Sequence, residues 1–229
     1  IPRLAVASLD SGFGEFKELE FSEELYTVGL GGNPEWDAPV VRIGYSSYTQ
    51  PSQVLDYTVA TGELTLLKEE EVEGGYNPDE YEAFREWATA PDGERVPISV
   101  VRRKGVEGPA PALLYGYGSY EASLDPEFSV AQLSLLDRGM VWVCAHVRGG
   151  GEMGRAWYDN GKMLHKANTF TDFIACADRV VELGLTTHEQ LVAEGGSAGG
   201  LLMGAVANMA PEKFAGILAI VPFVDPLTS

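Results

Sequence analysis

The sequence Gly195-Gly196-Ser197-Ala198-Gly199 constrains the fold of this chain more than any other segment. It has the form G-x-S-x-G, it follows an apolar strand-like run, and it precedes an apolar helix-like run. A sharp turn from strand to helix needs small residues around the serine, and it holds the hydroxyl at the helix N-terminus, where negative charge is stabilised. An ordinary glycine-rich turn can look similar, but the flanking strand and helix favour Ser197 as a nucleophile.

The chain around this turn has the pattern of an α/β protein from about residue 76 onward. Apolar runs alternate with a helical stretch in which Asn168 and Thr169 are candidate caps, and this alternation predicts a mostly parallel sheet. The expected strands are 86–90 and 96–101, which form a hairpin around Pro91-Asp92-Gly93, followed by 112–115, 141–147, 190–193 and 217–221. A sheet of this kind normally continues, so we expect the chain to be truncated at its C-terminus.

Residues 1–75 have a different pattern, that of short antiparallel strands bounded by turn residues. The expected strands are 3–9, 16–21, 25–30, 40–46, 54–59 and 64–67. One four-stranded propeller blade takes ~40 to 45 residues, so this region can hold one blade and part of another. We therefore expect two domains: the terminal blade region of a β-propeller over 1–75 and an incomplete α/β domain over 76–229.

Composition excludes several classes of function. The formal net charge of −18, from 34 acidic and 16 basic residues, argues against nucleic-acid binding and favours a cationic substrate. No run of 18 apolar residues and no signal-peptide pattern occurs, so we expect no membrane partner and a cytoplasmic location. Cys144 and Cys176 lack metal-ligand spacing, which predicts buried thiols and no metal site.

An acyl-transfer site also needs donors for the oxyanion. The backbone N–H of Ala198, directly after the candidate nucleophile, is one expected donor. The second should follow an earlier strand, where the segment Tyr115-Gly116-Tyr117-Gly118-Ser119-Tyr120 stands and the common H-G-G-G motif is absent. A phenol remains a donor at neutral pH, so Tyr117 can serve, although packing beside a glycine turn is the more common role for such tyrosines.

A second glycine-rich segment, 148–154, formally matches the G-x-G-x-x-G fingerprint of dinucleotide sites. The helix that this fingerprint requires does not follow directly, because Asp159-Asn160-Gly161 interrupts the segment. We therefore predict no nucleotide cofactor, and a loop near the active site in which Arg148 pairs with Glu152.

Four segments together resemble the prolyl oligopeptidase family, and within it the oligopeptidase B branch. They are LYGYGSY at 114–120, HVRGGGE at 146–152, GGSAGG at 195–200 and VPFVD at 221–225. The resemblance, which runs from about residue 40 to 229, implies a β-propeller that caps an α/β-hydrolase domain and cleavage of short peptides after Arg or Lys.

The resemblance also assigns roles to single residues. Ser197 matches the nucleophile, and Tyr117 and Ala198 match the oxyanion donors. Tyr120 matches an aromatic residue near the substrate channel, and Asp125 and Glu127 match an acidic pair that faces a basic substrate side chain. Two neighbouring carboxylates favour such a ligand on chemical grounds too, while a solvated loop is the plain alternative.

The general base has no candidate in the usual order of Ser, then acid, then His, because His146, His165 and His188 all precede Ser197. Asp225 comes too early after Ser197 to be the acid, so we expect it to be structural. We expect a peptidase fragment whose Asp and His lie outside these residues. The alternatives are a prolyl oligopeptidase, an acyl-peptidase or esterase of the same fold, or a catalytically silent binding module.

Overall fold

In the computed structural model, which describes residues 2–9, 12 and 14–225, the chain forms two compact units. The first unit contains the residues up to Asp79 and the later segment Asp125–Val130. The second contains Glu80–Leu124 and the residues from Ala131 onward. The chain therefore passes from the first unit to the second, returns for one short segment, and then stays in the second.

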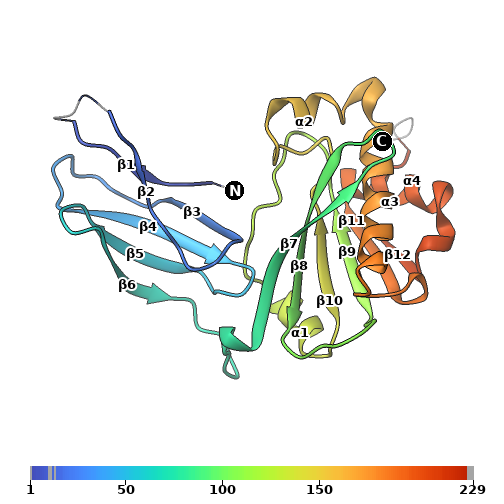
Figure 1. Cartoon of the computed structure of the whole chain (residues 1–229), viewed down its shortest axis with the longest axis horizontal. Helices are drawn as coiled ribbons and strands as arrows, with labels where there is room; N and C mark the ends of the chain where they lie inside the picture. Colours follow the sequence, from blue (N-terminus) through green and yellow to red (C-terminus); the bar gives the residue numbers. More distant parts are fainter. Residues whose placement is uncertain (1, 10–11, 13, 226–229) are drawn as a thin grey trace. The chain divides into compact units, whose positions relative to one another are not determined.

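The first unit is built on a four-stranded antiparallel sheet (Figure 1). Its strands lie in sequence order: β3 (Tyr26–Leu30), β4 (Val40–Ser47), β5 (Gln53–Thr58) and β6 (Glu63–Glu69), with a separate pair, β1 (Ala5–Val6) and β2 (Lys17–Glu18). Val28, Ile43 and Leu55 form the centre of its small core with two buried tyrosines. One such sheet has the strand order of a propeller blade, and the propeller itself stays a prediction.

The second unit is built on a six-stranded mixed sheet with the order β12-β11-β9-β10-β8-β7. Its strands are β7 (Tyr81–Thr89), β8 (Arg95–Arg103), β9 (Ala112–Gly116), β10 (Val141–Ala145), β11 (Leu191–Gly196) and β12 (Gly216–Ile220). Strands β9 to β12 run parallel, whereas β8 is antiparallel to both β7 and β10. The predicted α/β architecture is therefore present, with a hairpin at one edge of the sheet.

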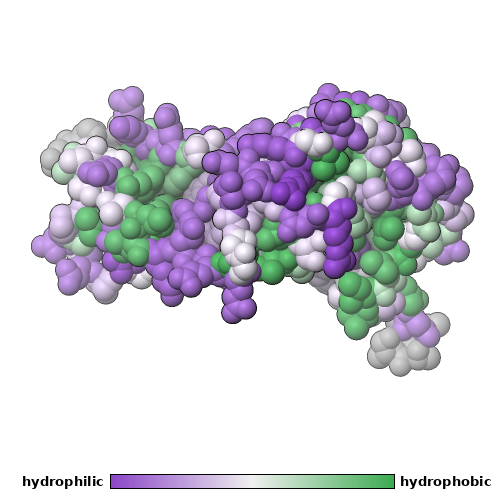
Figure 2. Space-filling model, turned by 90° about the horizontal axis from the view of Figure 1, so that it is seen from below, coloured by the Kyte–Doolittle hydropathy of each residue, from purple (hydrophilic) through white to green (hydrophobic). Residues whose placement is uncertain are grey.

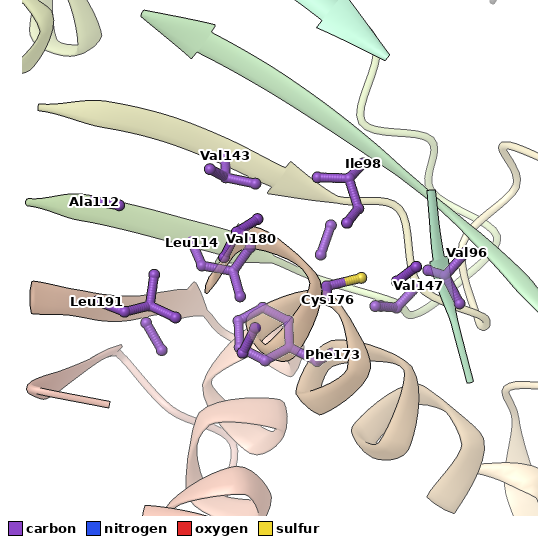
Figure 3. Packing of buried hydrophobic residues seen from close by; sticks show 14 of the residues in the cluster. Val96, Ile98, Ala112, Leu114, Val143, Val147, Phe173, Cys176, Val180 and Leu191 are labelled. Atoms are coloured by element: carbon purple, nitrogen blue, oxygen red, sulfur yellow. The ribbon is translucent and has the colours of Figure 1, made fainter. Parts of the chain in front are cut away.

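Four α-helices accompany this sheet: α1 (Val130–Leu136), α2 (Arg155–Asp159), α3 (Ala167–Glu182) and α4 (Ala198–Met209). Short 3₁₀ turns lie at η1 (Pro78–Glu80), η2 (Met163–His165), η3 (His188–Gln190) and η4 (Pro211–Lys213). Helix α3 packs on the sheet through Phe173, Cys176 and Val180, which meet Leu114 and Val143 in the core shown in Figure 3. Cys176 and Cys144 are both buried free thiols, which confirms that prediction.

The order of the strands brings two loops together. Strand β9 lies beside β11 in parallel register, with Tyr115 opposite Glu194. The carboxyl ends of parallel neighbours meet at the same edge of a sheet, which is where α/β proteins bind their ligands. The loop that begins at Tyr117 and the turn at Ser197 therefore start side by side.

Hydrophobic side chains remain exposed on and after β12, which pairs with β11 alone among the residues that the structure describes. Figure 2 shows hydrophobic surface gathered beside the grey atoms at its lower right. The residues concerned are Leu218, Ile220, Val221, Phe223 and Val224. Among the residues that the structure describes, no helix combines the length and apolar character needed to cross a membrane.

Candidate active site

Ser197 occupies a sharp turn between β11 and α4. Its backbone has φ 56° and ψ −113°, a conformation that non-glycine residues rarely adopt, and its side chain is exposed. Such a conformation costs on the order of 1–3 kcal/mol and persists where the surroundings enforce it. The serine is thus presented to solvent at the start of a 12-residue helix, as the G-x-S-x-G pattern predicted.

Two backbone hydrogen bonds hold this turn in place, and the close approach of Gly195 to Gly199 leaves no room for a side chain. The Ser197 N–H donates to the carbonyl of Ile220 at 2.9 Å, and the Phe223 N–H donates to the carbonyl of Ser197 at 3.1 Å. A Cβ on Gly195 would lie 2.4 Å from the carbonyl oxygen of Gly199. Side chains are therefore excluded there, which explains why the sequence around Ser197 is so rich in glycine.

Tyr117 lies against the first turn of the same helix. A Cβ on Gly199 would lie 2.7 Å from the Gly116 carbonyl oxygen and 3.4 Å from Tyr117 Cδ2. The first N–H groups of a helix have no acceptor within the helix, so the Ala198 N–H is available to a ligand. The turn therefore brings the Ser197 hydroxyl, a helix N-terminus and the Tyr117 ring into one small region.

The other predicted substrate residues are distributed over both units. Tyr120 belongs to the loop after Tyr117 and is 74% exposed, with φ 59°. Asp125 and Glu127 belong to the segment that returns to the first unit. Glu127 is exposed there and lines a hollow of about 330 Å³ with Thr27 and Gln53. The described residues contain no cluster of His, Cys, Asp and Glu suited to a metal ion.

The glycine-rich loop after β10 is held by a different ion pair from the predicted one. Arg148 donates to Asp172 from Nε at 2.8 Å and from a terminal nitrogen at 2.5 Å, and to Asp92 from the other at 2.5 Å. These hydrogen bonds raise the pKa of Arg148 further above its ordinary value. Glu152 instead accepts the Leu124 N–H at 3.0 Å. The predicted pairing of Arg148 with Glu152 is therefore wrong, because Asp172 on α3 presents both carboxylate oxygens to the guanidinium.

His146 is buried and contacts two polar side chains at a distance from Ser197 in the sequence. Its Nε2 lies 2.7 Å from Ser99 Oγ and its Nδ1 lies 3.4 Å from Glu152, in a fully buried position. Burial lowers the pKa of His146 below its ordinary value. His188 is engaged elsewhere, with Nδ1 3.0 Å from the carbonyl oxygen of Lys213. Neither ring is hydrogen-bonded to Ser197.

One residue near the site was missed by the sequence reasoning. Lys166, between η2 and α3, donates from Nζ to the Gly118 carbonyl at 2.5 Å and to Ser119 Oγ at 2.8 Å. Burial lowers the pKa of Lys166 to about 8. No spacing rule connects this lysine to a loop 48 residues earlier, so the sequence held no signal for the contact.

Comparisons with known proteins identify a family and several sequences to which the chain is similar. Residues 126–229 match the model of the prolyl oligopeptidase family. The chain is 49% identical to dipeptidyl aminopeptidase BI of Pseudoxanthomonas mexicana and 45% identical to protease 2 of Moraxella lacunata. These matches cover 94% of this chain but only 30% and 32% of those proteins.

Solved structures agree with these sequence matches. Oligopeptidase B of Trypanosoma brucei with covalently bound antipain is 50% identical, with a TM-score of 0.86 over 93% of this chain and 31% of that one. Oligopeptidase B of Leishmania major is 45% identical, with a TM-score of 0.87 over 97% of this chain and 32% of that one. The chain thus spans about a third of the length of these relatives, and it belongs to the prolyl oligopeptidase family of serine peptidases.

Proposed function

We propose that this chain is part of a serine-type oligopeptidase that cleaves short peptides after basic residues. The observation that carries the proposal is the exposed Ser197 hydroxyl at a strained strand-to-helix turn. Nucleophilic serines of α/β-hydrolases need this geometry, because it exposes Oγ and places the developing negative charge at a helix N-terminus. The likeness to oligopeptidase B and protease 2 supports the same assignment.

The proposed chemistry runs through an acyl-enzyme. Ser197 Oγ attacks the peptide carbonyl carbon while a base removes its proton, and the oxyanion accepts hydrogen bonds from the Ala198 N–H and the Tyr117 hydroxyl. The C–N bond then breaks, the amine leaves with the proton, and water hydrolyses the ester. We propose that the base and its acid partner come from outside these 229 residues, since His146 and His188 are already engaged.

Substrate choice is proposed to rest on Asp125 and Glu127, with Tyr120 as an apolar contact for the peptide. A guanidinium binds carboxylates through a fixed fork of donors, so two neighbouring carboxylates favour Arg over any neutral residue. The net charge of −18 adds a long-range attraction for cationic peptides. The proposed partners are therefore short basic peptides. The cytoplasmic location expected from the sequence stays a prediction.

The test of the nucleophile uses the natural protein that contains this sequence. It should hydrolyse a blocked Arg-Arg peptide coupled to a fluorescent amine, and Ser197→Ala should lower kcat by ~10⁶-fold. Tyr117→Phe should lower kcat by ~10² to 10³-fold with little change in KM. Hydrolysis that survives Ser197→Ala would contradict the assignment. An intact protein that hydrolyses none of these peptides would favour the silent binding module.

The test of substrate choice compares an Arg-Arg with a Gly-Arg substrate at two ionic strengths. Replacing Asp125 by Asn together with Glu127 by Gln should lower kcat/KM for Arg-Arg by ~1 to 3 kcal/mol and leave Gly-Arg nearly unchanged. Salt should weaken Arg-Arg turnover less in the variant. Equal losses on the two substrates would show that the carboxylates support their loop and do not read the peptide.

A second candidate function follows from one relative. The chain is 49% identical to dipeptidyl aminopeptidase BI, a name that denotes release of dipeptides from a free peptide N-terminus. Matched substrates with blocked and free N-termini separate the two activities: turnover of the free form alone would assign dipeptide release. A Gly-Pro substrate in the same panel tests the prolyl endopeptidase alternative, since one such relative is 34% identical.

A further inference from the structure

We propose that Lys166 is a positioning residue, whose Nζ holds the turn at Gly118 and Ser119 and thereby fixes Tyr117 against the helix that begins after Ser197. The proposal rests on the proposed function, because it concerns the residue offered there as an oxyanion donor. Lys166 acts through Tyr117 and not by contact with a substrate.

The contacts of Lys166 converge on this one turn. Its Nζ donates to the Gly118 carbonyl at 2.5 Å and to Ser119 Oγ at 2.8 Å. Within the described part of the chain, no carboxylate oxygen lies within 4 Å of this nitrogen, unlike the neighbouring Lys162, which pairs with Asp159. The Lys166 ammonium is partly buried, and its described hydrogen-bond acceptors are one carbonyl and one hydroxyl. These two groups therefore stabilise its charge in place of water.

The turn that Lys166 holds has an unfavourable backbone. Gly118 has φ 67°, and Tyr120 and Glu121 both have φ 59°. A Cβ on Gly118 would lie 2.5 Å from Thr169 and 2.6 Å from Val147, so the loop is pressed against its neighbours. Left-handed conformations at two consecutive non-glycine residues persist only where surrounding contacts enforce them. The Glu121 N–H donates to the Gly149 carbonyl at 3.1 Å, and the bonds from Lys166 hold the two residues directly before this pair.

Tyr117 is consequently held from both sides. On its N-terminal side the Gly116 carbonyl is pressed against Gly199 in the first turn of α4. On its C-terminal side the next two residues accept hydrogen bonds from Lys166. The peptide before Tyr117 is thus fixed against α4, and the second peptide after it is anchored by Lys166, which limits the freedom of the backbone that carries the Tyr117 ring.

The type of residue suits the task. A lysine offers three donors on a flexible stem, so one side chain reaches two acceptors on adjacent residues. Methionine has a similar length and no donor, which makes Lys166→Met the direct test. Lys162→Met is the matched control, because Lys162 lies four positions earlier and bonds to Asp159 and the Tyr158 ring.

The experiment measures kcat and KM for an Arg-Arg substrate in the natural protein and its variants. Lys166→Met should lower kcat by at least ~10-fold, short of the ~10² to 10³-fold expected for removing the oxyanion donor itself. KM should change by less than about twofold, since ground-state binding is untouched. Lys162→Met should leave both constants unchanged. Ser119→Ala, a small change that removes one acceptor, should give an intermediate loss in kcat.

The decisive measurement is the double variant. If Lys166 acts through Tyr117, Lys166→Met should cost less than about twofold once Tyr117 is already Phe, because coupled groups are not additive. An equal loss in both backgrounds would overturn the proposal. If Lys166→Met does not fold, the same comparison with Ser119→Ala decides. If Ser197→Ala and Tyr117→Phe both leave activity intact, the proposed function is wrong. If those variants are impaired but the losses from Lys166→Met and Tyr117→Phe are additive, only the role of Lys166 is wrong.

Discussion

At the scale of single residues, Arg148 pairs with two carboxylates that differ in their exposure to solvent. The guanidinium is 5% exposed, the Asp172 carboxylate is fully buried, and the Asp92 carboxylate is 48% exposed. The hydrogen bonds from Arg148 lower the pKa of Asp92. Removing one partner of a buried pair leaves the other charge uncompensated, whereas water replaces an exposed partner.

We therefore expect Asp172→Asn to lower the free energy of unfolding by ~3 to 5 kcal/mol. Asp92→Asn, the matched control on the exposed side, should cost about 1 kcal/mol or less. Urea unfolding followed by circular dichroism measures both losses. Similar losses in the two variants would mean that the buried carboxylate contributes no more than the exposed one.

His146 predicts the direction of a pH effect on stability. Burial lowers its pKa, so the folded state keeps the ring neutral while the unfolded state gains a proton as the pH falls through ~6.5. Its contribution to stability is therefore complete above that pH and declines below it. Unfolding free energies at pH 7.5, 6.5 and 5.5 should fall on acidification, and less steeply in His146→Gln. Identical slopes in the two proteins would contradict this account.

At the scale of elements, the turn at Ser197 depends on contacts between backbones. Gly199 in the first turn of α4 faces the Gly116 carbonyl, where a Cβ would lie at 2.7 Å, whereas Gly204 in the same helix faces a Val224 methyl at 3.2 Å. A methyl group can give way by a small rotation, but a carbonyl in the sheet cannot. The two glycines thus differ in what they tolerate.

Gly199→Ala should accordingly destabilise the protein by ~1 to 3 kcal/mol, since overpacking displaces the backbone that carries Tyr117. Gly204→Ala should be nearly neutral, because the ~1 kcal/mol helix propensity of alanine offsets a mild contact. Thermal unfolding of both variants checks the order, and a greater loss in Gly204→Ala would reverse it.

The elements themselves were predictable because their signals are local. Apolar runs and the turn residues that bound them located β3 to β12 within a few positions, and the glycines around Ser197 located the turn. The helix cap was wrong: Lys166 precedes α3 without a side-chain cap, and Thr169 donates to the carbonyls of Arg148 and Gly161. The partners of Arg148 were missed because they lie 24 and 56 residues away, where no spacing rule applies.

At the scale of the whole molecule, a large negative charge and an apolar sheet edge act in opposite directions. The charge of −18 repels other copies of the chain, while β12 and the residue after it expose Leu218, Ile220 and Val221 at an edge where no further strand pairs within the described residues. Salt screens the repulsion but leaves apolar contacts intact. An exposed apolar edge strand is a template for association.

The 229-residue polypeptide by itself should therefore self-associate, and more strongly as NaCl rises from 0.05 to 0.5 M, on the order of the range over which screening acts. Light scattering after size-exclusion chromatography measures the mass. Ile220→Lys should suppress association, whereas Trp36→Lys, which removes a 93% exposed apolar residue away from any strand, should not. Equal suppression by both would point to general surface hydrophobicity.

The segment Asp125–Val130 completes the first unit, although it is synthesised after part of the second unit. Pro126 accepts a hydrogen bond from Thr27 at 2.7 Å, the Phe128 N–H donates to Ser46, and the Phe128 ring meets Tyr76. A ribosome synthesises the chain from its N-terminus at ~5 to 20 residues per second. Glu80–Leu124, 45 residues of the second unit, is therefore synthesised before the segment that completes the first unit. During that interval the first unit is incomplete and is open to proteases and chaperones that act on nascent chains.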